Sequence, residues 1–498
     1  MAVIDRIPGQ TTAAAQRRVQ PGTASAGGQT ASREVMGKLP VPVLLYLAAV
    51  MLPIGFNLGP LYMTSVRAYL LIMIVPLTLR LFSGRLGRIL WTDILFFLHI
   101  AWTTVAIGVN NPAMVVQNTG SAAVEFLGGY LVARAYIRSR ADFIALCRWL
   151  GLLICLTLPL ALIEARTGTP LLINLIDKLP GIRSVGNVNI EPRMGLQRVQ
   201  VFMTHPIHYG LFCSTAFALT VVALKDVLST SRRFLIAGGI GLCVFLSLSS
   251  GALLPMILQI FMIIWIALFG RLRRPWLVLG ALIGIAWVVV DILSNRSPLM
   301  VFLSYATFSS HNAYWRAQIF DWGMKNVWGS PIFGIGFNDW VRPFYMTSGS
   351  MDNFWLVMAV RYGIPGFLLI AVGYGIGLLR VGFRDFTSDP VLAQLRRAWM
   401  FTFVGLTLTI CTVHIWTTIY SFVFFMFGAG IWFITAEPAG SPPDAAPEGL
   451  PRGAARLPVA AVRGGPQGGV SRAEPPSQPA AARHEAPRHT RFPIKPRP

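Results

Sequence analysis

Long apolar runs recur along most of the chain, and each is long enough to cross a membrane as a helix. About 20 apolar residues in a helix span the roughly 30 Å hydrocarbon core of a bilayer. The runs lie at 41–59, 66–83, 89–109, 120–137, 146–165, 206–225, 234–249, 251–270, 275–294, 354–380, 398–413 and 417–436. They predict an all-α polytopic membrane protein with about twelve transmembrane helices.

Charged residues are few and mostly basic. Only 12% of the residues are charged, against about 25% in soluble proteins, yet the formal net charge is +22. A basic chain can bind nucleic acid, but here Lys and Arg gather in short clusters between the apolar runs and towards the two ends. That distribution is typical of membrane orientation and of contact with anionic lipid. We therefore expect membrane lipids, and not nucleic acid, as partners.

The basic clusters alternate along the chain. Cytoplasmic connections are enriched in Lys and Arg, and with a cytoplasmic first segment the cytoplasmic connections contain Arg85, Arg88, Arg138, Arg140, Arg148, Lys225, Arg232, Arg233, Arg271, Arg273, Arg274, Arg380, Arg384, Arg396 and Arg397. The opposite connections 60–65, 110–119 and 414–416 contain no Lys or Arg. The alternation predicts that both ends of the chain are cytoplasmic.

The two ends differ in composition from the segment between them. Residues 1–38 are rich in Gly, Ala, Thr, Gln and Arg, and residues 437–498 in Pro, Ala, Gly and Arg. Such segments lack the apolar periodicity of a packed core, so they are expected to be disordered tails flanking a transmembrane domain at 39–436. The five cysteines all fall within apolar runs, which predicts buried thiols without disulfides.

Two long connections on the far side break the charge alternation. They span about 166–205 and 295–353 and contain Arg193, Arg198 and Arg316. Apolar stripes within both predict short interfacial helices. Guanidinium groups offer paired, charge-assisted hydrogen bonds to phosphate oxygens, so an anionic ligand such as a diphosphate lipid would explain the arginines. Contact with outer-leaflet headgroups is the alternative.

An ordered set of short motifs lies in and after the second connection. It comprises Tyr314-Trp315-Arg316, Trp322, the segment from Ser330 to Phe337, the segment from Met351 to Leu356, and Arg361-Tyr362-Gly363-Ile364-Pro365-Gly366. This set resembles the defining block of the O-antigen ligase and Wzy-type polysaccharide polymerase superfamily. A weaker upstream resemblance lies in Arg193-Met194-Gly195, Arg198, Thr204-His205-Pro206, Gly210 and the segment from Leu246 to Ala252. The family often has Arg where this chain has Ser250.

The main departure from the family lies at the start of the helix predicted after 350. Ligases of the family typically have His-Asn there, whereas this chain has Asp352-Asn353; His311-Asn312 is present but precedes Arg316. Asp352 is either a general base or a helix N-cap, because Asp suits both roles. Asn353 is expected to order the loop or bind a sugar hydroxyl. Gly334 and Gly336 beside Pro331 are explained by ordinary turn chemistry.

The resemblance implies transfer of a glycan from an undecaprenyl diphosphate carrier to a sugar hydroxyl, at the periplasmic face of the bacterial inner membrane. Arg316, Arg198 and Asp352 are the expected catalytic residues, with Arg193, His205, His311 and Asn353 binding substrate. The acceptor is a lipid-linked repeat unit for a polymerase or lipid A core for a ligase. The change from His to Asp at 352 favours a polymerase for O-antigen or exopolysaccharide, which can have a chain-length regulator as a partner.

Two further expectations concern chemistry and class. His205 and His208 have no evident third ligand, so no metal site or other cofactor is expected. A flippase or transporter of a lipid-linked or polar substrate is the rival from another class, with the same arginines binding cargo. Glu125 and Arg134 are candidate intramembrane charges, but no second half of the chain repeats the first, as many transporters would require.

Overall fold

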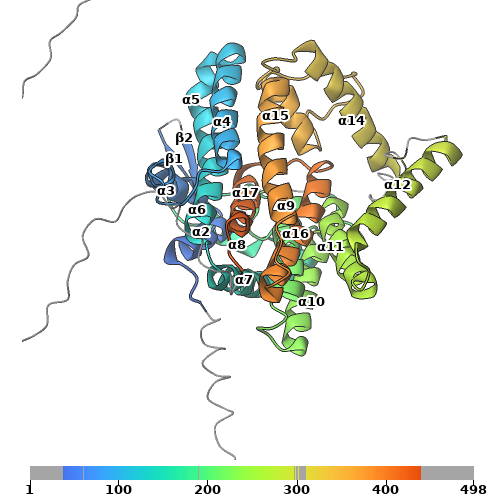
Figure 1. Cartoon of the computed structure of the whole chain (residues 1–498). Helices are drawn as coiled ribbons and strands as arrows, with labels where there is room; N and C mark the ends of the chain where they lie inside the picture. Colours follow the sequence, from blue (N-terminus) through green and yellow to red (C-terminus); the bar gives the residue numbers. More distant parts are fainter. Residues whose placement is uncertain are drawn as a thin grey trace, which may run out of the picture. The chain divides into compact units, whose positions relative to one another are not determined.

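The computed structural model describes residues 37–438, except 60, 189, 296–297, 299–300 and 302–309, and it leaves the side chains of 310–313 undescribed. The predicted tails 1–38 and 437–498 lie outside the described residues, apart from 37, 38, 437 and 438. All described residues belong to one compact unit, Met1–Ser441. Its arrangement is shown in Figure 1.

The unit is built mainly from helices, which confirms the predicted fold class. In chain order they are α2 (Val41–Met51), α3 (Ser65–Phe82), α4 (Trp91–Asn110), α5 (Val115–Ala123), α6 (Gly129–Tyr136), α7 (Arg140–Thr167), α8 (Leu171–Asp177), α9 (Pro206–Ala218), α10 (Thr230–Leu246), α11 (Ser250–Phe269), α12 (Pro275–Leu293), α14 (Ser310–Gly329), α15 (Phe354–Gly382), α16 (Pro390–Ile410) and α17 (Thr417–Ile431). A π-helical turn, Val124–Gly128, joins α5 to α6, and another, Leu219–Ala223, extends α9.

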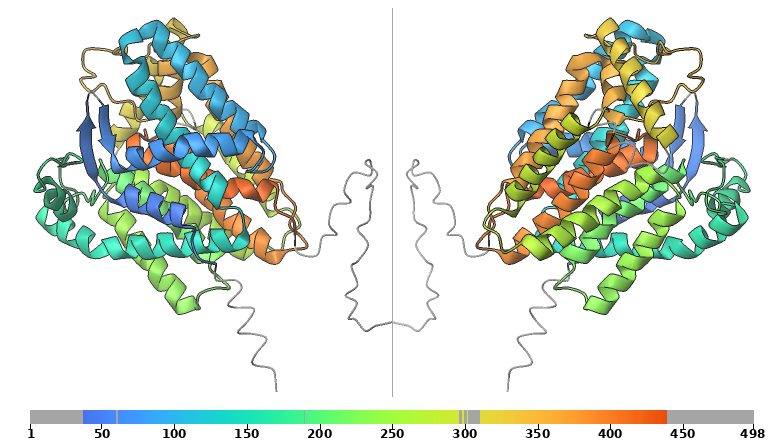
Figure 2. Two further views of the ribbon diagram at one scale, coloured as in Figure 1. Left: turned by 90° about the vertical axis from the view of Figure 1, so that its left-hand side faces the viewer. Right: turned by 90° about the vertical axis from the view of Figure 1, so that its right-hand side faces the viewer.

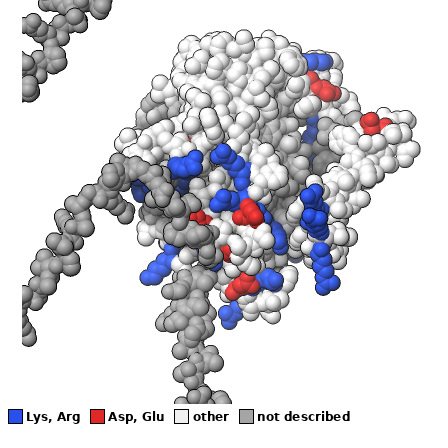
Figure 3. Space-filling view, viewed as in Figure 1, with Lys and Arg blue, Asp and Glu red and all other residues white. Residues whose placement is uncertain are grey.

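Eight helices in the described part of the chain are long and apolar enough to cross a membrane. They are α3, α4, α7, α9 with its π-helical turn, α11, α12, α15 and α17 with the turn that follows it. The other four predicted runs are also helical, as α2, the α5–α6 segment, α10 and α16. Twelve crossings therefore remain a prediction. In Figure 3 broad areas without Lys, Arg, Asp or Glu cover much of the visible face, as expected of a surface in contact with lipid.

The prediction of a helix over the whole run 41–59 is wrong for its second half. α2 ends at Met51, and Pro53 follows, whose ring leaves no N–H for a helix to use. The chain then forms strands β1 (Ile54–Leu58) and β2 (Leu61–Thr64), and β1 also pairs with β3 (Arg183–Ser184). This small antiparallel sheet, visible beside the α8 region in Figure 2, joins the start of the chain to the first long connection.

Small residues allow the central helices to pack closely. A side chain at Gly129 of α6 would place its Cβ 2.5 Å from the Ser421 carbonyl oxygen of α17. One at Gly428 of α17 would place it 2.6 Å from the Tyr130 carbonyl oxygen of α6. Close backbone approach through glycine is a common basis of helix association in membranes, where apolar lipid offers no hydrophobic driving force.

Two pairs of opposite charges lie within the bundle. Arg67 Nε of α3 lies 2.7 Å from Glu125 Oε1 in the first π-helical turn. Arg134 Nε of α6 lies 3.6 Å from Asp93 Oδ1 at the start of α4, and Tyr130 also donates a hydrogen bond to Asp93. The two residues predicted to be intramembrane charges therefore have partners, as the cost of an isolated charge in a membrane requires.

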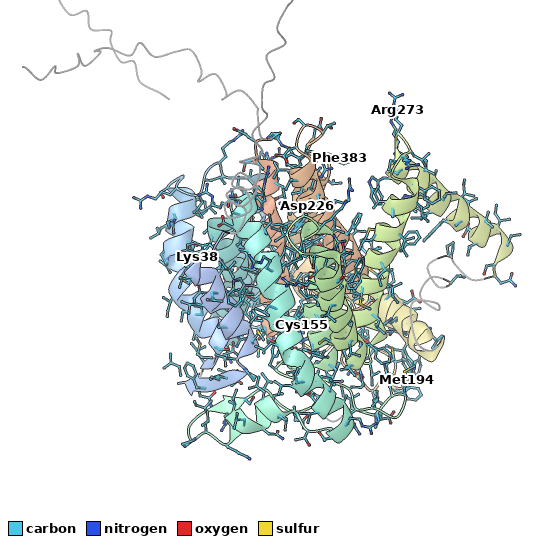
Figure 4. The ribbon with its side chains drawn as sticks, turned by 90° about the horizontal axis from the view of Figure 1, so that it is seen from below. Lys38, Cys155, Met194, Asp226, Arg273 and Phe383 are labelled. Carbon is cyan, nitrogen blue, oxygen red and sulfur yellow. The ribbon has the colours of Figure 1, made fainter. Side chains whose placement is uncertain are left out.

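The connections separate into two groups at opposite ends of the bundle. Asn111 Nδ2 and Asn338 Oδ1 join two connections predicted to be periplasmic. At the same end Ser184 Oγ donates to the Pro53 carbonyl and the Phe354 N–H to the Val413 carbonyl, between residues at the ends of predicted runs and the connections beside them. Connections predicted to be cytoplasmic contact each other through Arg138 with the Arg85 carbonyl, Arg140 with Asp389, and Gln394 with Asp226. Figure 4 shows Arg273 and Phe383 towards one end and Met194 at the other.

We expect the end that carries Met194 to face the periplasm. Cys411 is exposed, so it must first be replaced by Ser. In that background Lys178→Cys and Ser348→Cys, both at exposed positions of the long connections, should react with a membrane-impermeant thiol reagent in cells whose outer membrane is permeabilised. Arg273→Cys, exposed at the opposite end, should react only after lysis. The reverse labelling pattern would overturn the orientation.

Candidate functional site

A cavity of about 390 Å³ lies at the predicted periplasmic end, where five separate segments meet. The long connection before α9 contributes Arg193, Arg198 and His205, and α14 contributes Arg316. The rest of its lining is Ile190, Ile207, Ser249, Ser250, Trp315, Ser350, Asp352, Thr412, Val413, His414 and Trp416. The structure thus brings together five of the predicted site residues, which lie as far apart in the sequence as Arg193 and Asp352.

Backbone contacts hold the segment that carries Arg193 and Arg198. Arg193 and Leu196 exchange backbone hydrogen bonds around a turn in which Met194 and Gly195 have positive φ. The Val199 N–H donates to the Leu246 carbonyl at the end of α10. The Glu164 carboxylate of α7 accepts from the N–H groups of Gln200 and Val201, at 2.7 and 3.0 Å. These bonds fix where the two guanidinium groups emerge.

Arg316 and Asp352 approach the cavity from the second long connection. A Cβ at Gly251, in the first turn of α11, would lie 4.0 Å from Arg316 Nη2, so this guanidinium reaches the start of α11. Asp352 is exposed, and its Oδ1 accepts a hydrogen bond from Ser350 Oγ at 3.2 Å. Burial lowers the pKa of Arg316, and the nearby Asp352 carboxylate offsets part of that effect.

Positive charge in the cavity is not balanced. Three guanidinium groups face one carboxylate, and none of the four ion pairs among the described residues involves any of them. Burial, with a smaller effect from Arg193, lowers the pKa of Arg198 to about 10. The buried Nε of Arg198 has no hydrogen-bond partner. Arg193, by contrast, donates from Nη1 to the Leu248 carbonyl. A buried group of this kind is costly unless a ligand satisfies it, which indicates an anion site.

The hydrogen bonds of His205 determine its protonation. Its Nδ1 accepts from the Ile207 N–H at 3.1 Å, because His205 is the N-cap of α9. Burial and, to a smaller extent, nearby Arg198 lower the pKa of His205 to about 4. The ring is therefore neutral at working pH, with its proton on Nε2. His205 can donate to a ligand oxygen, but its Nδ1 is not available as a base.

His414 lines the cavity and was missed by the sequence analysis. It lies in the connection between α16 and α17, and its backbone carbonyl accepts from His208 Nε2 at 3.4 Å. Burial, with a smaller effect from Arg361, lowers its pKa to about 3, and its buried Nδ1 has no hydrogen-bond partner. The sequence feature that could have identified it is a histidine within 414–416, a short predicted connection that contains no Lys or Arg.

The hypothesis that Asp352 caps α15 is wrong. The N-cap is Asn353, whose Oδ1 accepts from the Leu356 N–H at 3.1 Å, so the helix begins one residue later than Asp capping would require. Asn353 does not line the cavity. The side chain of His311 lies outside the described residues, so its predicted role in binding stays a prediction. Ser250, where the family often has Arg, does line the cavity.

We expect Asn353→Ala to lower the free energy of unfolding by about 0.5–2 kcal/mol, because the α15 N-cap is lost. Asn353→Asp should restore most of it, since Asp caps about as well as Asn. Asp352→Ala, one position away and outside the cap, is the matched control and should change stability little. Thermal unfolding of the purified variants in detergent checks this, and equal loss for Asn353→Ala and Asp352→Ala would contradict the assignment.

Comparison with known proteins supports the resemblance seen in the motifs. Residues 234–371 match the family described as O-antigen ligase. The matched segment contains Ser249, Ser250, Trp315, Arg316, Ser350 and Asp352 of the cavity, whereas Arg193, Arg198, His205 and His414 lie outside it. A search of curated proteins found no match. No group of three His, Cys, Asp or Glu side chains in the described part of the chain is placed to hold a metal ion. The family match supports an enzyme of the O-antigen ligase and polymerase superfamily in a multi-pass membrane protein.

Proposed function

We propose that this protein is a polysaccharide polymerase that joins undecaprenyl-diphosphate-linked repeat units at the periplasmic face of the bacterial inner membrane. The observation that carries the proposal is the group of three arginines facing one carboxylate in a cavity at the Met194 end of the bundle. A diphosphate supplies the negative charge that this cavity lacks. Its lipid chain would lie against the apolar helices that surround the site.

The reaction needs stabilisation of charge and one proton transfer. The acceptor hydroxyl oxygen attacks the anomeric carbon of the donor glycan, the bond from that carbon to the diphosphate oxygen breaks, and the lipid diphosphate leaves with the bonding electrons. Arg316, Arg198 and Arg193 stabilise the charge that develops on the leaving oxygen. Asp352 takes the hydroxyl proton, since its carboxylate faces the cavity and no helix cap uses it.

The acceptor distinguishes a polymerase from a ligase. The family description favours transfer to lipid A core by a ligase, which is the second candidate. The Asp352-Asn353 pair in place of His-Asn favours the polymerase, with a lipid-linked repeat unit as acceptor and a chain-length regulator as a partner. A flippase is less favoured, because Glu125 and Arg134 in the bundle each have a partner of opposite charge, and the cavity arginines, which form no ion pair with a described residue, lie at one end.

We expect Arg316→Lys to abolish most glycan transfer while the protein remains in the membrane at normal level. Lysine keeps the charge but loses the two-pronged geometry that matches phosphate oxygens. Transfer should be measured with lipid-linked repeat units and purified protein. Arg183→Lys is the matched control, because Arg183 is exposed in β3 and outside the cavity. Equal rates for both variants would reduce Arg316 to a lipid contact.

We also expect Asp352→Asn to lower kcat strongly without weakening the binding of the donor. The amide cannot accept the proton, but removal of a negative charge beside Arg316 leaves the cavity more attractive to a diphosphate. Asp321→Asn, on the exposed face of α14, is the control. Parental turnover by the Asp352 variant would exclude this carboxylate as the base, and a weaker affinity for the donor would contradict its placement.

A further inference from the structure

A second cavity, of about 560 Å³, adjoins the first. The two share three lining residues, Ser350, His414 and Trp416. The second is otherwise enclosed by the glycine-rich turn after α14, the loop that follows it, and the first turns of α15. Nothing in the proposed binding of the donor uses this space, yet glycosyl transfer needs two substrates to meet at one point.

The second cavity has a different chemical character from the first. Its charged lining residues are one acid, Asp339, and one base, Arg361, so it lacks the excess of positive charge. Phe337, Trp340 and Trp416 supply aromatic rings, and polar groups lie between them. Aromatic surface combined with convergent hydrogen-bonding groups suits a neutral polyhydroxylated ligand better than a diphosphate.

The wall formed by the glycine-rich turn is held rigidly. Asn111, after α4, accepts from the Phe337 N–H at 2.8 Å and donates to Asn338 at 3.0 Å. The N–H groups of residues 335 and 336 donate to carbonyls of α15, and a Cβ at Gly336 would lie 2.2 Å from Asn111 Oδ1. The motif beginning at Pro331 therefore shapes this cavity. A site whose walls are fixed before binding loses less entropy when a ligand enters.

His414 lies where the two cavities meet. Its ring stacks on Trp416, with centroids 5.5 Å apart, and lies nearly parallel to Phe354 at 6.4 Å. Both nitrogens of its neighbour His208 are engaged, with Thr204 Oγ1 and the His414 carbonyl. His205 Nδ1 is also engaged, so His414 Nδ1 is the histidine nitrogen in this cluster that is buried and without a partner.

We infer that the second cavity binds the terminal sugar of the acceptor glycan, and that His414 orients the attacking hydroxyl towards the first cavity. This inference rests on the proposed glycosyl transfer. The hydroxyl donates a hydrogen bond to His414 in the ground state, and its proton passes to Asp352 when the new glycosidic bond forms. His414 is a positioning residue that contacts substrate, and it ends the reaction in the form in which it began.

The test fills the second cavity without touching the first. Gly349 lines only the second, has no positive φ, and a Cβ there would meet its nearest neighbour at 3.7 Å, which is ordinary contact, so a side chain can begin there without a backbone clash. With lipid-linked donor and a lipid-free repeat unit as acceptor, Gly349→Leu should raise the acceptor KM about tenfold or more and leave the donor KM unchanged. Gly186→Leu, at an exposed glycine with open space around it, is the matched control.

A second variant tests His414. His414→Phe keeps the stacked ring but removes the acceptor nitrogen, so kcat should fall while the donor KM holds, and His414→Gln should recover part of the loss. A rise in donor KM with Gly349→Leu, or no change in either KM, would overturn the inference. Direct binding of the lipid-free repeat unit, measured by saturation-transfer NMR, distinguishes failure of this inference from failure of the proposed function. If Gly349→Leu loses binding of the repeat unit and Gly186→Leu keeps it, the second cavity is supported as the acceptor site even if no glycan transfer occurs. If the wild-type protein binds the repeat unit but transfers no glycan to it, the proposed function is contradicted.

Discussion

The excess of positive charge in one cavity is the feature on which the rest of the site depends. Arg193, Arg198 and Arg316 come from two connections far apart in sequence, and each must be held against the repulsion of the others. The segment with Arg193 and Arg198 is held by a backbone bond from Val199 to Leu246, by the bond from the Arg193 side chain to the Leu248 carbonyl, and by the buried carboxylate of Glu164. The charge is thus preorganised, and under the proposed function it would stabilise a leaving diphosphate without rearrangement during the reaction.

The two long connections together form much of the two cavities. The connection before α9 presents Arg193, Arg198 and His205 to the first cavity, and the connection before α15 forms most of the second cavity. The short connection carrying His414 and Trp416 separates the two cavities and contacts both. Donor and acceptor would approach from the two sides of this short connection. The proposed reaction would then depend on long ordered connections to bring two glycans together.

Much of this arrangement could be predicted from the sequence, because hydropathy and charge are strong local signals. The twelve apolar runs all contain helix. The alternation of basic and non-basic connections assigned them to two groups, and in the structure contacts form between connections of the same group. Strands β1 and β2 were not predicted, and the pairing of β1 with Arg183–Ser184 is a tertiary contact that leaves no periodic pattern. The motif order brought Arg198, Arg316 and Asp352 into one hypothesis. His414 was not predicted, because local spacing in the sequence does not show which residues lie close together across the bundle. The sequence also could not distinguish Asn353 from Asp352 as the N-cap, because both residue types suit that position.

Equilibrium binding of undecaprenyl diphosphate to the purified protein in nanodiscs tests the central claim most directly. If the three arginines hold a diphosphate, the wild-type protein should bind this lipid at least about tenfold more tightly than undecaprenyl monophosphate. That preference should disappear when Arg198 and Arg316 are both replaced by Gln, and it should weaken with rising salt. Equal affinity for the two lipids in the wild-type protein, or an unchanged preference in the double variant, would show that the cavity does not recognise the diphosphate and would contradict the account.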